Sequence, residues 1–300
     1  MFIRYPIRRI NGGGQNDGEK ERGLGLHARR VIAYIVLILI AAFCLIWFFV
    51  LFVNATRSDG ELARGFSPFP STHLLENWNN MMAKSITDFG RGMLNSLLVS
   101  GCSAVLCVYF STMTAYALHA YDFKLKKFFF TFIIVVMTIP TQISALGFVQ
   151  LVDAVNLKDS YLPLILPVIA SPVTFFYIKQ YMQSNLPGSL IEAARIDGSG
   201  EFQTFNRIAF PLMKPAIAVQ AIFSFVSTWN NYFVPALILS SNEKRTLPIM
   251  SFMLRSQAPS HLEFGQIYMS IAFSIFPVVL VYILLSRFIV QGVTVGSVKG

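Results

Sequence analysis

The sequence is poor in charge. Of its 300 residues only 13% are Asp, Glu, Lys or Arg, about half of the roughly 25% found in ordinary soluble domains. Six uncharged windows, each 19 to 30 residues long, cover half of the chain: 31–56, 92–121, 128–152, 160–178, 215–242 and 264–286. A helix needs about 20 largely apolar residues to cross a bilayer. These windows exclude a soluble enzyme, a disordered chain and a fibrous one, and they predict a polytopic membrane protein.

Alternation of apolar and polar residues, which is typical of a membrane β-barrel, is also missing. The apolar runs are continuous, and 31–53 is the clearest of them. We therefore predict an all-α chain with six transmembrane helices in one membrane domain, 31–300. The segment 1–30 precedes it, and its positive region is too long for a cleaved signal. Its glycine-rich stretch, 11–18, predicts a flexible cytoplasmic arm.

Groups that carry chemistry are scarce. The three cysteines all lie inside apolar windows, and the four histidines are scattered without metal-binding spacing. No Gly-x-x-x-x-Gly-Lys-Ser/Thr phosphate loop is present, so the chain is not itself an ATPase. No basic face or zinc spacing indicates nucleic acid. The sequence predicts no enzyme, no metal and no cofactor, and the uncharged windows disfavour a proton-coupled transporter.

The distribution of positive charge predicts the orientation. If both termini are cytoplasmic, the inner segments carry 16 of the 24 Lys and Arg residues and the outer segments carry 8. Lys and Arg concentrate in cytoplasmic loops of membrane proteins. Both termini are therefore expected in the cytoplasm.

The predicted inner segment 185–211, between the fourth and fifth windows, has the most informative pattern. Asn185 can cap a first helix over 189–197, and Gly198 can supply the left-handed residue that ends it. Ser199 can cap a second helix that runs to about 209 and closes at Pro211. Two short amphipathic helices joined by a sharp turn would form a compact cytoplasmic knob. The residues alone leave open an interfacial helix pair lying on the membrane, with Glu192 paired to Arg195.

The motif Glu192-Ala193-Ala194, followed by Asp197-Gly198 and later by Pro211, resembles the signature loop of bacterial ABC importer permeases. Ser199 stands where that family usually has alanine. In the family this loop is the coupling helix that docks into a cleft of the ATPase subunit. The resemblance therefore implies an ATPase-docking set: Glu192, Ala193, Ala194, Asp197, Gly198, Phe202 and Phe205.

The C-terminal residues 291–300 resemble the tail of the six-span G-type subunit in maltose-type sugar importers. That tail reaches between the two ATPases, which adds Gln291, Gly292 and Lys299 to the docking set. The resemblance covers about 31–300. It implies a second, homologous permease, two ATPase subunits that bind ATP, an external solute-binding protein, a mono- or oligosaccharide substrate, and a bacterial cytoplasmic membrane.

Polar residues inside the windows are candidates for the substrate pathway: Gln142, Trp229, Asn230, Asn231 and Tyr232. Aromatic rings can stack on sugar faces while amides bond to hydroxyl groups. Buried Asn can instead join helices, a contact worth about 0.6 kcal/mol on average.

The predicted outer segment 241–266 is expected to face the binding protein through Ser251, Arg255 and Gln257; the alternative is an ordinary connecting loop. Within transport, the alternative substrates are a polyol, glycerol phosphate or an acidic oligosaccharide. A membrane-embedded enzyme or a signalling anchor is the rival outside transport.

Overall fold

The structure is a computed structural model that describes residues 15–83, 88–257 and 263–296, apart from the side chains of 15–28, 141–142 and 290–296. The described residues form helices and no strands. The longer helices are α1 (Gln15–Asn54), α4 (Phe89–Ala120), α5 (Lys126–Val136), α6 (Thr141–Ala154), α8 (Pro172–Asn185), α12 (Lys214–Trp229) and α15 (Phe264–Gly296). The shorter ones are α2 (Asp59–Ala63), α3 (Leu74–Met82), α7 (Leu162–Ile165), η1 (Leu166–Ala170), α9 (Gly188–Ile196), α10 (Glu201–Thr204), η2 (Phe205–Ala209), α11 (Phe210–Leu212), α13 (Phe233–Ile238), η3 (Asn242–Lys244) and α14 (Leu247–Arg255).

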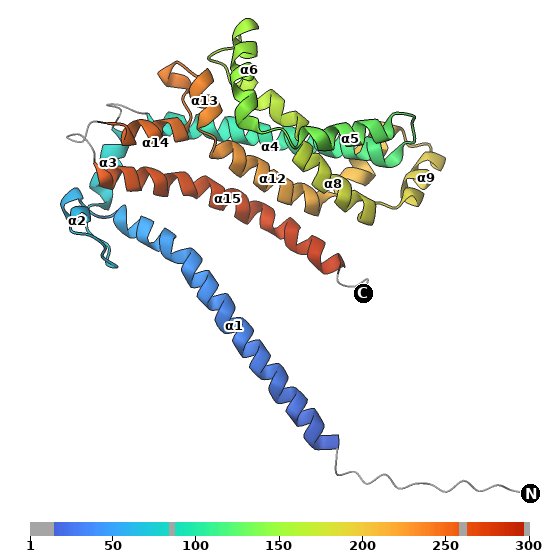
Figure 1. Cartoon of the computed structure of the whole chain (residues 1–300), viewed down its shortest axis with the longest axis horizontal. Coiled ribbons are helices and arrows are strands. Elements are labelled where there is room, and N and C mark those ends of the chain that lie inside the picture. The colour runs from blue at the N-terminus through green and yellow to red at the C-terminus, as the bar shows by residue number, and fades with distance from the viewer. Residues whose placement is uncertain (1–14, 84–87, 258–262, 297–300) are drawn as a thin grey trace, which may run out of the picture.

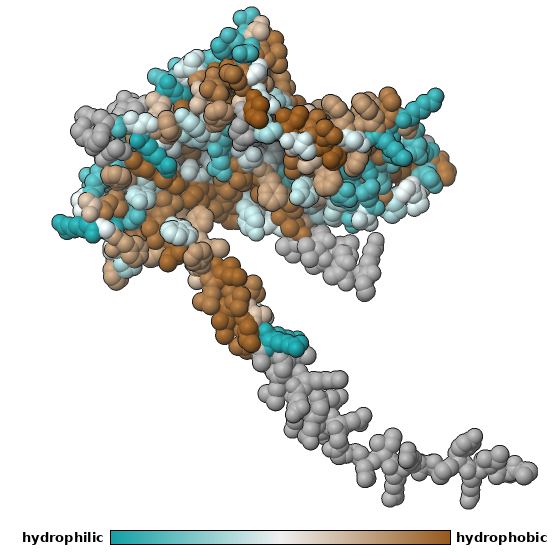
Figure 2. All heavy atoms as spheres, viewed as in Figure 1, coloured by the Kyte–Doolittle hydropathy of each residue, from teal (hydrophilic) through white to brown (hydrophobic). Residues whose placement is uncertain are grey.

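Helix α4 is the centre of the bundle. It packs against α8 and α12, and α12 packs in turn against α15. The side chain of Asp88 caps α4 by accepting a hydrogen bond from the backbone N–H of Arg91 at 3.0 Å. Helix α1 contacts α15 and then swings away from the other helices (Figure 1). Its apolar side chains are exposed (Figure 2), as expected for a surface that faces lipid.

Four segments are long and apolar enough to cross a membrane: Arg29–Asn54, Phe89–Ala120, Leu162–Asn185 and Phe264–Ile289. They correspond to the first, second, fourth and sixth predicted windows. A bent pair, Glu201–Leu212 and Lys214–Trp229, meets at 81° and gives a fifth candidate. The expected membrane-spanning all-α fold is present, but three of the six windows are not single continuous helices.

The interrupted windows are the third, the fourth and the fifth. In the fourth, α7 and η1 lead through the extended residue Ser171 into α8. Helix α5 ends at Val136 and α6 begins at Thr141, after Pro140, which has no N–H to continue the first helix. In the fifth window α12 ends at Trp229, and a short turn leads into α13. The predicted count of six spans, one helix per window, is therefore not confirmed by single helices.

Two further expectations differ from the structure. Helix α1 begins at Gln15, so much of the segment predicted to be a flexible arm is helical, because its glycines are interspersed with helix-forming Glu, Lys and Arg. The fourth span extends to Asn185 and includes Lys179, which is buried. Lys179 lies one residue beyond the uncharged window 160–178, so the window itself is free of charge but the candidate span that contains it is not.

The connecting segments gather at two ends of the bundle. Helices α2, α3 and α14 lie at one end, and α9 lies at the other, beside the start of α5 (Figure 1). The described end of α15 points toward the α9 end (Figure 1). This division matches the alternation of predicted outer and inner segments.

Candidate functional site

The segment 185–211 forms the predicted knob at the end of the bundle marked by α9 (Figure 1). Helix α9 spans Gly188–Ile196, and Gly198 follows with a φ of +76°. That left-handed conformation is inexpensive only for glycine. The prediction of a first helix ended by a left-handed glycine is confirmed.

The second half of the knob is less regular than predicted. The short helix α10 passes into a π-helical turn, Phe205–Ala209, and then into α11, which contains Pro211. Neither Asn185 nor Ser199 caps a helix: the Asn185 amide donates to the Tyr181 carbonyl, and the Ser199 hydroxyl accepts from Thr204. The two predicted caps and the simple helix to 209 are therefore wrong.

An ion pair between Arg195 and Glu201, together with the aromatic ring of Tyr121, joins the two halves of the knob. The Arg195 Nε lies 2.9 Å from Glu201 Oε1, and the Tyr121 hydroxyl donates to Glu201 Oε2. The Arg195 guanidinium also lies 5.4 Å above the Tyr121 ring centroid. Hydrogen bonds from Tyr121 and Arg195 lower the pKa of Glu201, whereas burial and the Glu201 carboxylate raise the pKa of Tyr121 to about 12. Arg195 thus pairs with Glu201 and not with Glu192, and the sequence analysis missed this cluster.

The predicted docking residues divide into an inner and an outer group. Ala194 and Phe205 are 5% and 2% exposed, and Phe205 packs in a cluster with residues of α4 and α8, so both belong to the interior of this chain. Ile196 and Phe202 are 85% and 71% exposed and give the knob an apolar outer surface. The remaining knob residues of the predicted docking set are exposed as well: Glu192, Ala193, Asp197 and Gly198.

The predicted docking residues of the tail are only partly described. Gln291 and Gly292 lie in the last part of α15, so the tail continues as helix there and does not begin as an extended segment. Their side chains, and Lys299 altogether, lie outside the described residues.

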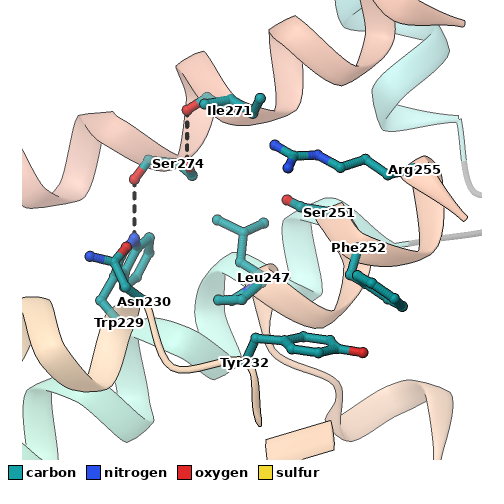
Figure 3. A pocket seen from close by; sticks show the side chains of 10 residues that line it. Trp229, Asn230, Tyr232, Leu247, Ser251, Phe252, Arg255, Ile271 and Ser274 are labelled. Carbon is teal, nitrogen blue, oxygen red and sulfur yellow. Dashed lines mark hydrogen bonds between the residues drawn. The ribbon is translucent and has the colours of Figure 1, made fainter.

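A pocket of about 410 Å³ lies at the opposite end of the bundle, where the α12–α13 turn meets α14 and α15 (Figure 3). Its lining unites residues from two separate predictions, the substrate pathway and the binding-protein contact. The lining residues are Trp229, Asn230, Tyr232, Leu247, Pro248, Ser251, Phe252, Arg255, Ile271 and Ser274.

Helix α14, which forms one side of the pocket, is fixed to α4 by two polar side chains. The Asn95 amide donates to the Glu243 and Arg245 carbonyls at 2.9 Å, just before α14 begins. The Ser96 hydroxyl accepts a 2.8 Å hydrogen bond from the backbone N–H of Leu247. The sequence analysis assigned no role to either residue.

Trp229 forms a rigid wall of the pocket. It is 2% exposed, stacks on Phe225 with ring centroids 5.6 Å apart, and donates from Nε1 to the Ser274 carbonyl at 3.1 Å (Figure 3). The Tyr232 ring lies 4.6 Å from the Phe252 ring on another side of the pocket. Trp229 is thus largely used in packing, whereas Tyr232 is only half-buried.

The other predicted pathway residues lie in different places. Asn230 lines the pocket, but Asn231 is not among its lining residues and accepts a 3.4 Å hydrogen bond from the backbone N–H of Val234. The side chain of Gln142 lies outside the described residues.

The predicted binding-protein residues lie on or just after α14. Ser251 and Arg255 line the pocket, and the Arg255 guanidinium points into it (Figure 3). Gln257 follows the helix and is partly exposed. The sequence analysis missed Phe252 and Ser274; Ser274 could have been found as a polar residue within an apolar window.

The described part of the chain contains no cluster of His, Cys, Asp and Glu that could hold a metal ion. A bundle of apolar helices with a helical knob at one end and an open pocket at the other is the architecture of a membrane transport subunit. The chain belongs to the family described as "Binding-protein-dependent transport system inner membrane component", whose model matches residues 108–295. It is therefore a transport permease and not an enzyme, as predicted.

Two relatives and one solved structure agree with this assignment. The chain is 37% identical over 206 residues to the arabinooligosaccharides transport system permease protein AraQ of Bacillus subtilis, covering 69% of this chain and 72% of that one. It is 31% identical over 281 residues to the sn-glycerol-3-phosphate transport system permease protein UgpE of Yersinia pestis, covering 91% and 97%. A bacterial ABC transporter involved in the import of the acidic polysaccharide alginate matches with a TM-score of 0.75 at 19% identity, over 87% of this chain and 96% of the other. The predicted ABC importer permease fold is confirmed.

Proposed function

We propose that this chain is one of two permease subunits in an ATP-driven bacterial importer that takes a carbohydrate from an external binding protein. The names of the relatives, which include an arabinooligosaccharide permease, support the substrate class. The pocket supports it too, because aromatic and neutral polar side chains line most of it. Both termini are cytoplasmic in this proposal, in agreement with the charge distribution.

The outer surface of the knob is the observation that carries the proposal. Ile196 is strongly exposed outside every candidate span, and Phe202 is strongly exposed in the first turn of the bent pair Glu201–Leu212 and Lys214–Trp229. Exposed apolar patches commonly mark protein interaction sites. Glu192, Ala193 and Asp197 share this surface. It is the docking surface for an ATPase subunit, which binds the ATP. The tail, with Gln291, Gly292 and Lys299, makes a second contact with the two ATPases.

The pocket end of the bundle faces outward in this proposal. Tyr232 and Asn230 contact the passing sugar, with Gln142 and Asn231 nearby on the pathway and Trp229 as the wall behind them. Ser251, Arg255 and Gln257 lie on the side where the binding protein docks. A second, homologous permease completes the pathway.

One substitution in the knob tests the coupling. Gly198→Asp should abolish uptake while the protein stays in the membrane, because an aspartate at a φ of +76° strains the turn and displaces α10. Gly200→Asp is the matched control, since Gly200 has a φ of −66° and is the N-cap residue of α10, and no heavy atom lies within 4 Å of an added Cβ. Normal uptake by the Gly198 variant at normal expression would contradict the docking role.

A phosphorylated or acidic substrate is the second candidate, favoured by the Arg255 guanidinium that points into the pocket (Figure 3) and by the similarity to UgpE. Guanidinium groups bind carboxylates and phosphates in two-pronged geometry. Uptake of labelled arabinooligosaccharide and labelled sn-glycerol-3-phosphate, measured side by side, distinguishes the two candidates.

A further inference from the structure

Lys179 is a buried cation without a described partner. It lies in α8 within the candidate span Leu162–Asn185 and is 7% exposed. Among the described residues no hydrogen bond and no ion pair reaches its Nζ. Ionisable residues within membrane spans are rare and usually have a functional partner. The structure therefore calls for an anion beside Lys179.

The neighbour of Lys179 on α5 is another lysine. The rings of Phe130 and Phe175 lie 6.3 Å apart where α5 packs on α8. Lys126 lies one turn before Phe130, and Lys179 lies one turn after Phe175. Since residues four apart share a helix face, this contact places the two lysines on facing sides of α5 and α8, beside one another.

The carboxylate of Asp122, near the start of α5, already has a partner. Asp122 Oδ1 lies 2.8 Å from Lys126 Nζ, so it compensates one lysine and leaves the other. Lys124 and Lys127 add two more positive charges to the same short segment. The region therefore carries an excess of positive charge at the end of the bundle that holds the knob.

The first turn of α5 offers donors as well. Its N-cap residue, Leu125, makes no side-chain cap, and the described hydrogen bonds include none from the backbone N–H groups of Lys127 and Phe128. Free N–H groups at a helix N-terminus bind anions, phosphate above all. The ammonium groups of the lysines and these backbone N–H groups can both donate hydrogen bonds to one anionic ligand.

The surface next to these donors is apolar. Phe128, Phe129 and Phe132 are 61%, 43% and 55% exposed, and the rings of Phe128 and Phe132 stack. This surface continues from the basic end along α5, which looks apolar beside hydrophilic residues (Figure 2). A ligand with an anionic head and apolar chains fits both parts, whereas a small soluble anion uses only the first.

We propose that the start of α5 and the adjacent face of α8 bind the phosphate of an anionic phospholipid, with Lys179 and Lys126 as its cationic ligands and the Phe128–Phe132 surface along its acyl chains. Basic recesses between membrane helices are suited to such headgroups. The binding itself does not depend on the transported substrate. Only the assignment to the cytoplasmic leaflet depends on the proposed orientation.

The test uses the assembled importer in nanodiscs and in detergent, with phosphatidylglycerol as the probe and phosphatidylcholine as the uncharged reference. Native mass spectrometry should show phosphatidylglycerol bound to the wild type, with affinity reduced about fivefold by Lys179→Gln and by Lys126→Gln. Lys158→Gln is the matched control, because Lys158 is an exposed lysine that pairs with Asp153 in the turn after α6. It should bind the lipid as the wild type does.

Three results would overturn the proposal. The first is unchanged phosphatidylglycerol binding in both variants at Lys179 and Lys126. The second is equal loss in the Lys158 control. The third is saturation of the site by inorganic phosphate in lipid-free detergent at the same affinity, which would identify a soluble anion as the ligand. Loss of lipid binding with normal carbohydrate uptake would support the site, and failed uptake with normal lipid binding would count against the transport proposal alone.

Discussion

Trp229 and Tyr232 lie three residues apart beside one pocket, yet they differ in burial. Trp229 has almost no exposed surface and bonds to α15, whereas Tyr232 retains part of its ring at the pocket. The sequence pattern made both residues pathway candidates, because it cannot distinguish an aromatic residue that packs behind the pocket from one that contacts the substrate. Which of these roles a residue has depends on how its ring packs against α15.

Substitution of Trp229 should therefore mainly affect stability, and substitution of Tyr232 should mainly affect uptake. Trp229→Ala should lower the free energy of unfolding by about 3–5 kcal/mol, the usual cost of removing a large buried aromatic side chain, and should reduce the amount of folded protein. Tyr232→Ala should lower the melting temperature less than Trp229→Ala does, because Tyr232 is only half-buried, and it should reduce uptake. Thermal unfolding in detergent and uptake in cells check the pair, and equal loss of stability in both variants would contradict the assignment.

Glu201 should give the knob a pH-dependent stability. Its pKa is lowered in the folded protein by Tyr121 and Arg195 from a usual value of 4.5. The stabilisation is therefore complete above that value and is lost as the pH falls through the lower pKa of the folded state. Glu201→Gln should reduce the melting temperature slightly at pH 7, and the difference should shrink below about pH 4.

Glu192→Gln is the control for that measurement, since Glu192 is an exposed carboxylate in the same knob. It should shift the melting temperature little at either pH. A constant difference between wild type and the Glu201 variant from pH 7 to pH 3 would show that the Arg195–Glu201 pair does not contribute.

At the scale of elements, the start of α15 is held close to the segment after α1. The Asn77 amide donates to the Ala55 and Arg57 carbonyls, and the Gly265 N–H donates to Asp59 at 2.9 Å. A Cβ on Gly265 would lie 2.6 Å from Asn77 Oδ1 and 2.9 Å from the Arg57 carbonyl oxygen. The backbone of the 55–57 segment therefore leaves room only for glycine.

Gly265→Ala should accordingly destabilise the protein by about 1–3 kcal/mol, the usual cost of overpacking. Gly101→Ala is the matched control within another helix, because nothing lies within 4 Å of its added Cβ. It should be neutral or slightly stabilising, since alanine favours helix. Chemical denaturation of the two variants compares them directly, and equal effects would disprove the close approach.

The elements that could be predicted from the sequence are those controlled by local rules. Helix α9 and the left-handed Gly198 follow from helix-forming residues and glycine chemistry within a few positions, although the predicted caps were wrong. Long apolar windows predicted α4 and α15. The breaks near Pro140 and after Trp229 were not predicted. A proline in an apolar window permits either a kink or a break, and neighbouring helices decide which forms. The π-helical turn at Phe205 likewise depends on packing against α4 and α8.

At the scale of the whole molecule, helix α9 of the knob and helix α14, which lines the pocket, lie at opposite ends of the bundle (Figure 1). Cysteines at Gln203 and Gln257 should therefore react from opposite sides of the membrane, after Cys44, Cys102 and Cys107 have been replaced. A membrane-impermeant maleimide added to intact cells should label position 257 and leave position 203 unlabelled until the membrane is opened. Labelling of position 203 first would reverse the proposed orientation.

Helix α1 is longer than a membrane crossing requires. Its 40 residues at 1.5 Å per residue extend about 60 Å, about twice the hydrocarbon thickness of a bilayer. The apolar part begins only at Arg29, so the 14 residues from Gln15 to that point form a rod about 20 Å long beyond the bilayer. A helical rod of this kind is a spacer of fixed length, which keeps the residues before Gln15 at a set distance from the membrane. A flexible tether of the same length would leave that distance variable.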